Sequence, residues 1–353
     1  MIPHIRSSIV TPTLLIGLLV LSLVLARRPY YNWDMFPYLA IVIAQPGLPF
    51  DSTHREVYRA ARDELPVQDF QAISSRQPKL MEDPAAFLEI MKYFSIKPGY
   101  TWLARGFYHL GAKPVMSTWL PSVISYFLVG VLVYFHARRH APPMPSALFV
   151  MIIALSPQFL NLARYSSPDM LCALVSTAGT ILVLRSLTIP GLALLTMAVW
   201  IRPDSAIFLM LTVGILWIMK QITWYQGTVL VFLTAASLWL LLGNTSLINE
   251  YLLLDYSLSD HWAAFRTGLG SLFQSLTLPM IALALGMIYF RQSYAIDLRT
   301  WLLAAAVGTL LLRYFLHPFT EDRFNLPAYL LISLVAWETM AQRHYGEVSA
   351  TKS

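Results

Sequence analysis

The residues with the clearest capacity for chemistry are acids and arginines that interrupt otherwise apolar sequence. Asp34 lies inside the aromatic segment Tyr30–Tyr38, directly after the first hydrophobic run. Aromatic side chains of this kind settle at a membrane–water boundary. A carboxylate held beside a membrane helix is costly to keep there, so it marks a functional site by default. Asp34 is therefore the first candidate for a group that accepts a proton.

Four further clusters place an arginine within a few residues of a carboxylate. They are Arg164–Asp169, Arg202-Pro-Asp204, the segment Asn244–Gly270 (with Glu250, Asp255, Asp260, His261 and Arg266), and His317–Arg323 (with Glu321 and Asp322). Guanidinium groups bind phosphate oxygens in pairs, and a carboxylate can take a proton from an incoming hydroxyl or amine. The pattern predicts a cavity for an anionic headgroup at one face of a membrane.

Each cluster also has a structural interpretation. Arg202-Pro-Asp204 can be a helix break with a local ion pair. Ser166 or Ser167 can cap a helix whose first turn carries an acid, which the helix dipole favours. Glu321 and Asp322 can cap the last span in the same way. These interpretations stay open at the level of sequence.

Two single residues need partners wherever they lie. Arg313 stands inside an apolar run, where a guanidinium requires a counter-charge, and a structural salt bridge is one explanation. Asp34 can be an interfacial acid paired with Arg27 or Arg28. The functional interpretation instead brings both residues to a bound anion.

Metal and nucleotide chemistry have little support in the sequence. His54, His109 and His261 are well separated, and no His, Cys and carboxylate spacing resembles a closed metal site. A hard divalent ion bridging Asp34 and Asp169 is conceivable on charge grounds. No glycine-rich phosphate loop, Gly-x-Ser-x-Gly or HExxH motif occurs. We therefore assign no cofactor and no metal ligand.

Composition identifies the class of protein that must position these residues. Of 353 residues, 57% are hydrophobic and 12% are charged, about half the charged fraction of soluble domains. Repeated apolar runs of about 17 to 22 residues predict a polytopic helical membrane protein. The net charge of +6 comes from Lys and Arg at loop ends, which argues against nucleic-acid binding. The single cysteine, Cys172, allows no intrachain disulfide.

The hydropathy pattern predicts an all-α protein with about ten membrane spans, forming one domain over residues 1–353. The spans are placed near 10–26, 117–135, 144–162, 170–187, 191–200, 205–219, 227–242, 272–289, 301–316 and 324–340. The fifth is short and can be partly re-entrant. The first is interpreted as a retained anchor because Leu23-Val-Leu-Ala-Arg-Arg is a poor signal-peptide cleavage site.

The first two spans are separated by residues 27–117, a loop too long for a simple connection and therefore expected to be functional. We expect it to contain four helices: a short one from Tyr38 lying against the membrane, then His54–Glu64, Asp83–Phe94 and Thr101–Leu110.

Basic residues in the short loops predict the orientation, because cytoplasmic loops are enriched in Lys and Arg. One side carries Arg138-Arg139-His140, Arg185, Lys220, Arg291, Arg299, Arg343 and Lys352. That side also holds both termini and is therefore cytoplasmic, which places Asp34 and the long loop outside. Arg164, Arg202, Arg266 and Arg323 lie outside against this rule, so they need another reason for their position.

The order of these motifs resembles that of a known superfamily. The relevant segments are Asp34 in a long loop after the first span, Lys97-Pro-Gly-Tyr-Thr-Trp-Leu, Ser167-Pro-Asp169, Arg202-Pro-Asp204 and Asp322-Arg-Phe-Asn-Leu-Pro327. Together they resemble the GT-C membrane glycosyltransferases, which include protein mannosyltransferases and the enzyme that adds aminoarabinose to lipid A. The resemblance covers most of the chain, although each motif is short.

The resemblance implies a glycosyltransferase of the bacterial inner membrane and cell envelope. It would move a sugar, with inversion, from a polyprenyl-phosphate donor to a lipid, glycan or protein acceptor on the non-cytoplasmic face. Asp34 would be the general base, and Asp169 would orient the acceptor. Arg202, Arg313 and Arg323 would neutralise the departing lipid phosphate. The remaining substrate contacts would come from Lys97, Tyr100, Arg164, Asp204, His317, Glu321 and Asp322.

Two non-enzymatic interpretations remain. The chain can be a carrier or flippase for an anionic lipid, although transporters tend to bind at the bilayer midplane and to show internal repeats, and no repeat is apparent here. It can also be a scaffold subunit of a membrane complex that docks through its first loop.

Overall fold

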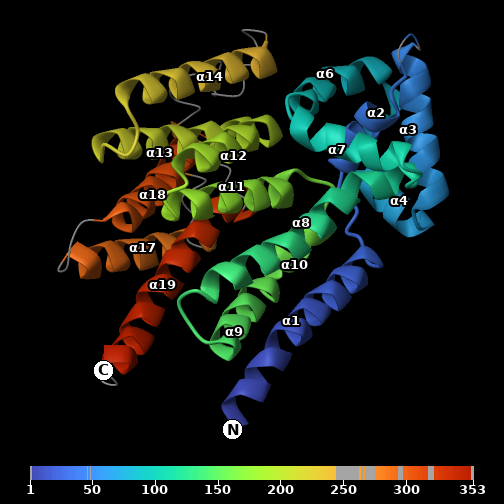
Figure 1. Ribbon diagram of the computed structural model, residues 1–353. Coiled ribbons are helices and arrows are strands. Elements are labelled where there is room, and N and C mark those ends of the chain that lie inside the picture. Colours follow the sequence, from blue (N-terminus) through green and yellow to red (C-terminus); the bar gives the residue numbers. More distant parts are fainter. Residues whose placement is uncertain are drawn as a thin grey trace.

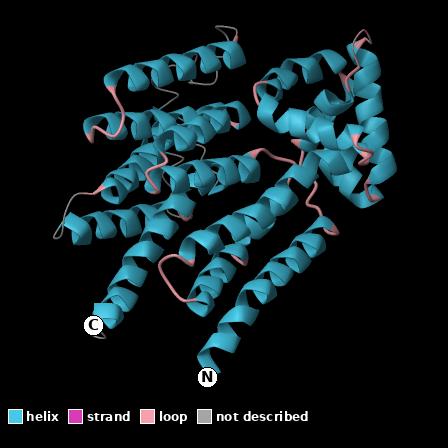
Figure 2. Ribbon diagram, in the orientation of Figure 1, coloured by secondary structure: helices cyan, strands magenta, loops and turns pink. Residues whose placement is uncertain are grey.

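The computed structural model describes residues 2–45, 47, 49–243, 262–263, 266, 275–292, 297–316 and 322–350. Within these residues the chain forms helices joined by turns, without strands (Figure 2). The all-α prediction is therefore confirmed for this part of the protein.

Four helices are long and apolar enough to cross a membrane: α1 (Ile2–Ala26), α8 (Pro114–Ala137), α14 (Trp224–Leu242) and α18 (Leu298–Leu316). A fifth span is possible where α9 (Pro143–Ala154) continues into α10 (Pro157–Arg164), which are bent by 62° at the break between them. Several apolar helices of membrane-spanning length support an integral membrane protein.

Other predicted spans are shorter helices. They are α11 (Asp169–Leu184), α12 (Thr188–Ile201), α13 (Ala206–Ile218) and α17 (Thr277–Gln292), while the longer α19 (Leu326–Ala350) includes Glu338 and Arg343. Each predicted span thus corresponds to a helix or a bent pair, yet length and composition support four or five spans among the described residues. The sixteen residues of α11, for example, extend about 24 Å, less than the roughly 30 Å of a bilayer core.

The first loop folds into its own group of helices: α2 (Met35–Ile43), α3 (Phe50–Glu64), α4 (Val67–Ser74), α5 (Pro78–Glu82), α6 (Pro84–Ser95) and α7 (Pro98–His109). In Figure 1 this group gathers around the start of α8, away from both termini. The three later helices expected in the loop are confirmed. Asp83 caps α6 by accepting hydrogen bonds from the backbone N–H groups of Ala85 and Ala86 at 2.9 and 3.2 Å.

Helix α2 corrects one expectation. We predicted a short helix lying against the membrane, but α2 is enclosed by protein, and Met35, Phe36, Leu39 and Ala40 are fully buried. It packs on α3, α7 and α8. A helix that is apolar on every side suits a protein interior as well as it suits a lipid boundary. Burial of α2 fixes the position of Asp34, which directly precedes it.

An antiparallel hairpin of α11 and α12 carries two of the predicted site residues. Asp169 begins α11, and Arg202 directly follows the end of α12. The two backbones touch at Gly179 and Gly191, where an added Cβ would lie 2.8 and 2.7 Å from the other glycine's carbonyl oxygen. Small residues allow helices to approach this closely. The close contact sets the register that brings Asp169 level with Arg202.

Candidate functional site

The centre of the site is a run of alternating charges at one end of this hairpin. The backbone of Arg202 is extended, and the short 3₁₀ turn Pro203–Ser205 follows it. This turn lets the Arg202 guanidinium donate two hydrogen bonds to Asp204, from Nε at 3.0 Å and from Nη2 at 3.1 Å. The Arg202 Nη1 contacts Asp169. The local ion pair expected for Arg202-Pro-Asp204 is confirmed, and Asp169 extends it.

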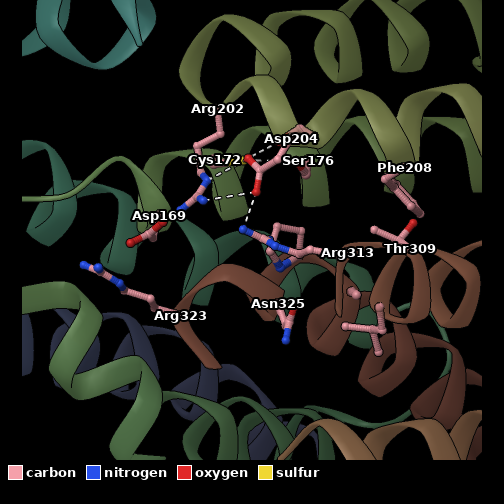
Figure 3. A pocket seen from close by; sticks show the side chains of 14 residues that line it. Asp169, Cys172, Ser176, Arg202, Asp204, Phe208, Thr309, Arg313, Arg323 and Asn325 are labelled. Carbon is pink, nitrogen blue, oxygen red and sulfur yellow. Dashed lines mark hydrogen bonds and ion pairs between the residues drawn. The ribbon is translucent and has the colours of Figure 1, made fainter. Parts of the chain in front are cut away.

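Arg313 completes the run from a distant helix. It projects from α18 and pairs with the second oxygen of Asp204, so that Asp204 lies between two guanidinium groups (Figure 3). The side chains of Asp169, Asp204 and Arg313 are 1%, 5% and 12% exposed. The intramembrane arginine therefore has the counter-charge that the sequence required.

A pocket opens beside this run and also reaches Arg323 and Asn325. Its free volume is about 30 Å³, enough for one or two water molecules. A phosphate or sugar cannot enter this space while the ion pairs are closed. A larger ligand would have to bind at the mouth of the pocket or separate a pair.

Arg323 lines this pocket and forms a second ion pair, in which it donates to Asp34 at 2.9 Å. Arg323 belongs to the 3₁₀ turn η2 (Asp322–Asn325). The expected alternative, a pair between Asp34 and Arg27 or Arg28, is not what forms. The side chains of Asp34 and Arg323 are 25% and 18% exposed. Asp34 is thus more exposed than Asp169 and Asp204, the other two carboxylates described here.

Lys97 lies close to both the Arg202–Asp204 pair and the Asp34–Arg323 pair. It directly precedes α7, and its Nζ donates to the hydroxyl of Tyr38 at 3.3 Å and lies 5.0 Å from the ring centre of Phe94. Burial and then the nearby Arg202 lower the pKa of Lys97, against smaller opposing effects of Asp34 and Asp204, to about 8. Among the described residues, no carboxylate forms an ion pair with Lys97.

Charge counting summarises the arrangement. Among the described side chains, four cations and three carboxylates lie near one another, namely Lys97, Arg202, Arg313 and Arg323 with Asp34, Asp169 and Asp204. These seven groups carry one net positive charge when all are ionised. The site is suited to a ligand with a single negative charge, such as a phosphodiester.

Two predicted contacts have structural partners instead. The hydroxyl of Tyr100 is buried and donates to the carbonyl of Thr118, although its ring packs edge-on against Tyr38 at 4.7 Å. Arg164 donates to the carbonyl of Arg28 and so attaches the end of α10 to the start of the first loop. Both residues position the site rather than face its opening.

The serine cap expected before Asp169 is wrong. Pro168 occupies the N-cap position of α11, which has no side-chain cap. Ser166 instead hydrogen-bonds Thr118 at 2.8 Å, while the Ser167 carbonyl accepts from Ser122 at 3.0 Å. These bonds hold the α10–α11 turn against α8, and the first-turn acid is neutralised by Arg202 instead of the helix dipole alone.

Several predicted residues cannot be placed. Glu250, Asp255, Asp260, His261, His317 and Glu321 lie outside the described residues, as does the side chain of Asp322. Of that outer loop, Arg266 is described, and its guanidinium lies 5.7 Å from the ring centre of Trp262.

Sequence reasoning missed two features. The hydroxyl of Tyr38 was not predicted as a contact of the site, because the sequence places Tyr38 among several aromatic residues expected at the membrane boundary. His136, His140 and Glu338 meet at the far end of α8, although only the spacing of the two histidines hinted at a shared role.

No protein-family model matches this chain, and neither does any curated protein or solved structure.

Proposed function

We propose that this protein is a membrane glycosyltransferase that moves a sugar from a polyprenyl-phosphate donor to an acceptor at the outer face of the membrane. The observation that carries the proposal is the environment of Lys97. The Lys97 ammonium pairs with no carboxylate among the described residues, and it lies near both a partly exposed acid and a buried run of ion pairs. An anionic donor would supply the missing charge, and Asp34 lies beside the same opening. The resemblance to GT-C enzymes supports the same reaction.

The reaction assigns Asp34 as general base. It takes the proton of the acceptor hydroxyl or amine while the acceptor atom bonds to the anomeric carbon. The bond from that carbon to the phosphate oxygen breaks on the opposite face, which inverts the configuration. The polyprenyl phosphate leaves with the bonding electrons, and its charge grows from about one to about two negative charges.

Lys97 and Arg323 are the groups that we assign to this growing charge. Arg323 lines the pocket, and Lys97 lies near both Arg323 and Asp34. In this proposal Arg323 exchanges Asp34 for phosphate oxygens. Preorganised cations of this kind often supply the largest part of a rate enhancement.

The proposal gives a positioning role to the four buried residues Asp169, Asp204, Arg202 and Arg313. Their mutual ion pairs are too buried for direct contact with an acceptor. They form a rigid wall behind the phosphate, which lowers the cost of orienting the donor.

The full topology is part of the proposal. Ten spans, with the bilayer thinned locally around the shorter helices, would put both termini in the cytoplasm of a bacterial cell and the α2–α7 group outside. The basic ends of α8, α17 and α19 favour this orientation.

Native mass spectrometry of the purified protein tests the proposal, with polyprenyl monophosphate as the added probe. We expect wild type and Asp34→Asn to bind this lipid, and the variant to retain a co-purified sugar-loaded donor because its transfer step is blocked. Lys97→Met should bind the lipid about tenfold more weakly. Asp51→Asn, at an exposed position in α3, serves as the control and should match wild type.

Two outcomes would contradict the proposal. If no form binds polyprenyl phosphate, the scaffold interpretation gains. If wild type and Asp34→Asn retain the loaded donor equally when acceptor-containing membranes are added, the protein is a carrier instead of a transferase.

A further inference from the structure

A second polar cluster lies where the last turn of α8 meets α19. The Nε2 atoms of His136 and His140 lie 2.6 and 3.4 Å from the same oxygen, Oε1 of Glu338. The three ligand atoms are all within 4.8 Å of one another. Two ring nitrogens and one carboxylate oxygen therefore converge on a single point.

This convergence places two nitrogen ligands and one oxygen ligand at a shared point. The His136 ring is buried, and its Nδ1 has no hydrogen-bond partner among the described residues, so its polar contact is on the side facing Glu338. The Glu338 oxygen has two lone pairs and can accept a hydrogen bond from each ring. A cation at the shared point would bind all three atoms directly.

The distances suit a small tetrahedral ion. Zinc binds imidazole nitrogen and carboxylate oxygen at about 2.0–2.2 Å, which separates neighbouring ligand atoms by roughly 3.4 Å. His140 and Glu338 already have this separation. The contact from His136 to Glu338 is a hydrogen-bond distance and would open by less than about 1 Å.

The surroundings add the features that support a metal site. Arg299 binds the other oxygen, Oε2 of Glu338, which leaves Oε1 free to act as a single-oxygen ligand and fixes its direction. His140 is 18% exposed, whereas His136 and Glu338 are 2% and 1% exposed. His140 thus provides an entry path for an ion and a position where water can complete the coordination.

We infer that His136, His140 and Glu338 form a binding site for a divalent transition-metal ion of the zinc type. The ion joins the end of α8 to α19, two helices whose contacting residues here are 202 positions apart in the chain. This site lies about 15 Å along α19 from Ala328, which lines the pocket of the first cluster. Its role is to clamp the two helices, and it does not depend on the proposed transfer reaction.

Cobalt(II) is the probe for this inference, because a tetrahedral Co²⁺ ion absorbs visible light strongly. The full-length protein in detergent, with any affinity tag removed, is stripped of metal and titrated with Co²⁺. We expect one ion per chain, the absorption bands of tetrahedral coordination, and an increase of a few degrees in melting temperature. Zn²⁺ should displace the cobalt and remove the bands.

Two histidine variants provide the comparison. His140→Ala leaves the Glu338–Arg299 pair in place and should weaken binding at least about 100-fold, since even outer-shell changes cost 10–100-fold. His344→Ala removes an exposed histidine of the same helix and should leave binding unchanged. The inference is overturned if wild type gives no tetrahedral spectrum at millimolar Co²⁺, or if His140→Ala binds as wild type does.

Discussion

The two charge clusters of this protein are built from similar groups and differ in what they leave unsatisfied. In the cluster around Asp204, the described arginines and acids pair with one another, but no described acid pairs with Lys97, and Asp34 remains partly exposed. Around Glu338, the carboxylate pairs with Arg299, and two histidine rings share one of its oxygen atoms. The first arrangement favours an anion, whereas the second favours a cation.

The difference shows that buried ion pairs alone say little about function. Such pairs often add little net stability over an apolar alternative. The informative feature in each cluster is the group that its ion pairs leave over. In the cluster around Asp204 this group is the lysine ammonium, and in the cluster around Glu338 it is the pair of histidine nitrogens directed at one carboxylate oxygen.

The largest expected effect is on the chemistry at Asp34. Asp34→Asn should lower the rate of sugar transfer by about 10²–10⁴-fold, because a general base of this kind contributes that much. The release of polyprenyl phosphate from loaded donor measures it. Glu338→Gln should leave this rate within a few-fold of wild type. An equal loss in both variants would mean that the clusters are not functionally separate.

The next effect is on stability. Asp204→Ala removes the buried carboxylate that pairs with both Arg202 and Arg313 and should lower the free energy of unfolding by about 3–5 kcal/mol. Unfolding in mixed micelles followed by circular dichroism measures this. Glu56→Gln, which breaks the exposed pair with Arg59, should produce no measurable change. Similar values for the two variants would show that the Asp204 run is well hydrated.

A smaller effect should follow from moving the α11–α12 hairpin. Gly179→Ala forces a methyl group against the backbone of Gly191, at a cost of about 1–3 kcal/mol, and should weaken lipid binding by misaligning Asp169 and Arg202. Gly286→Ala, where α17 offers open space, should be neutral or slightly stabilising. Cobalt binding at His136 and His140 should survive both changes.

The smallest effect is a dependence on pH. Lys97 is charged below its pKa of about 8, so the affinity for polyprenyl phosphate should fall by up to about tenfold as pH rises from 7 to 9. A bound phosphate raises the pKa of Lys97, which moves the decline above pH 8. Lys97→Arg stays charged throughout this range and should show a flat profile. A decline that persists in this variant would point to another group.

The lowered pKa of Lys97 should also make folding stability depend on pH, and stability should rise with pH where lipid affinity falls. The unfolded chain holds the Lys97 proton up to its ordinary pKa of 10.5, whereas the folded chain releases it near 8. The unfolded state therefore binds more protons between these values, and wild type should gain stability relative to Lys97→Met as pH rises from 8 to 10.5. Below pH 8 this difference should be constant.

The positions of the helices could be predicted from sequence to a greater extent than their burial and packing. Apolar runs located each long helix, and Pro84 marked the start of α6 because proline fits the first helical turn. The depth of α2 could not be predicted, since a buried helix and a lipid-facing helix have the same composition. The number of ten spans stays a prediction for a similar reason, because hydropathy does not distinguish a short apolar helix from a full crossing.

The candidate site shows the same limit. The arginine–acid clusters were visible as neighbours in sequence, and the pair between Arg202 and Asp204 followed directly. The pairs of Asp34 with Arg323 and of His136 with Glu338 join distant positions, for which one sequence contains no signal. Local spacing instead favoured Arg27 or Arg28 for Asp34, and three-dimensional packing overruled it.

The Asp34–Arg323 pair has a consequence for biosynthesis, because its two residues are 289 positions apart. At about 5–20 residues per second of chain elongation, the ribosome needs roughly 15–60 s to add Arg323 after Asp34. Throughout that interval the Asp34 carboxylate lacks this partner. The pair can therefore form only after helices α1 to α18 have been synthesised.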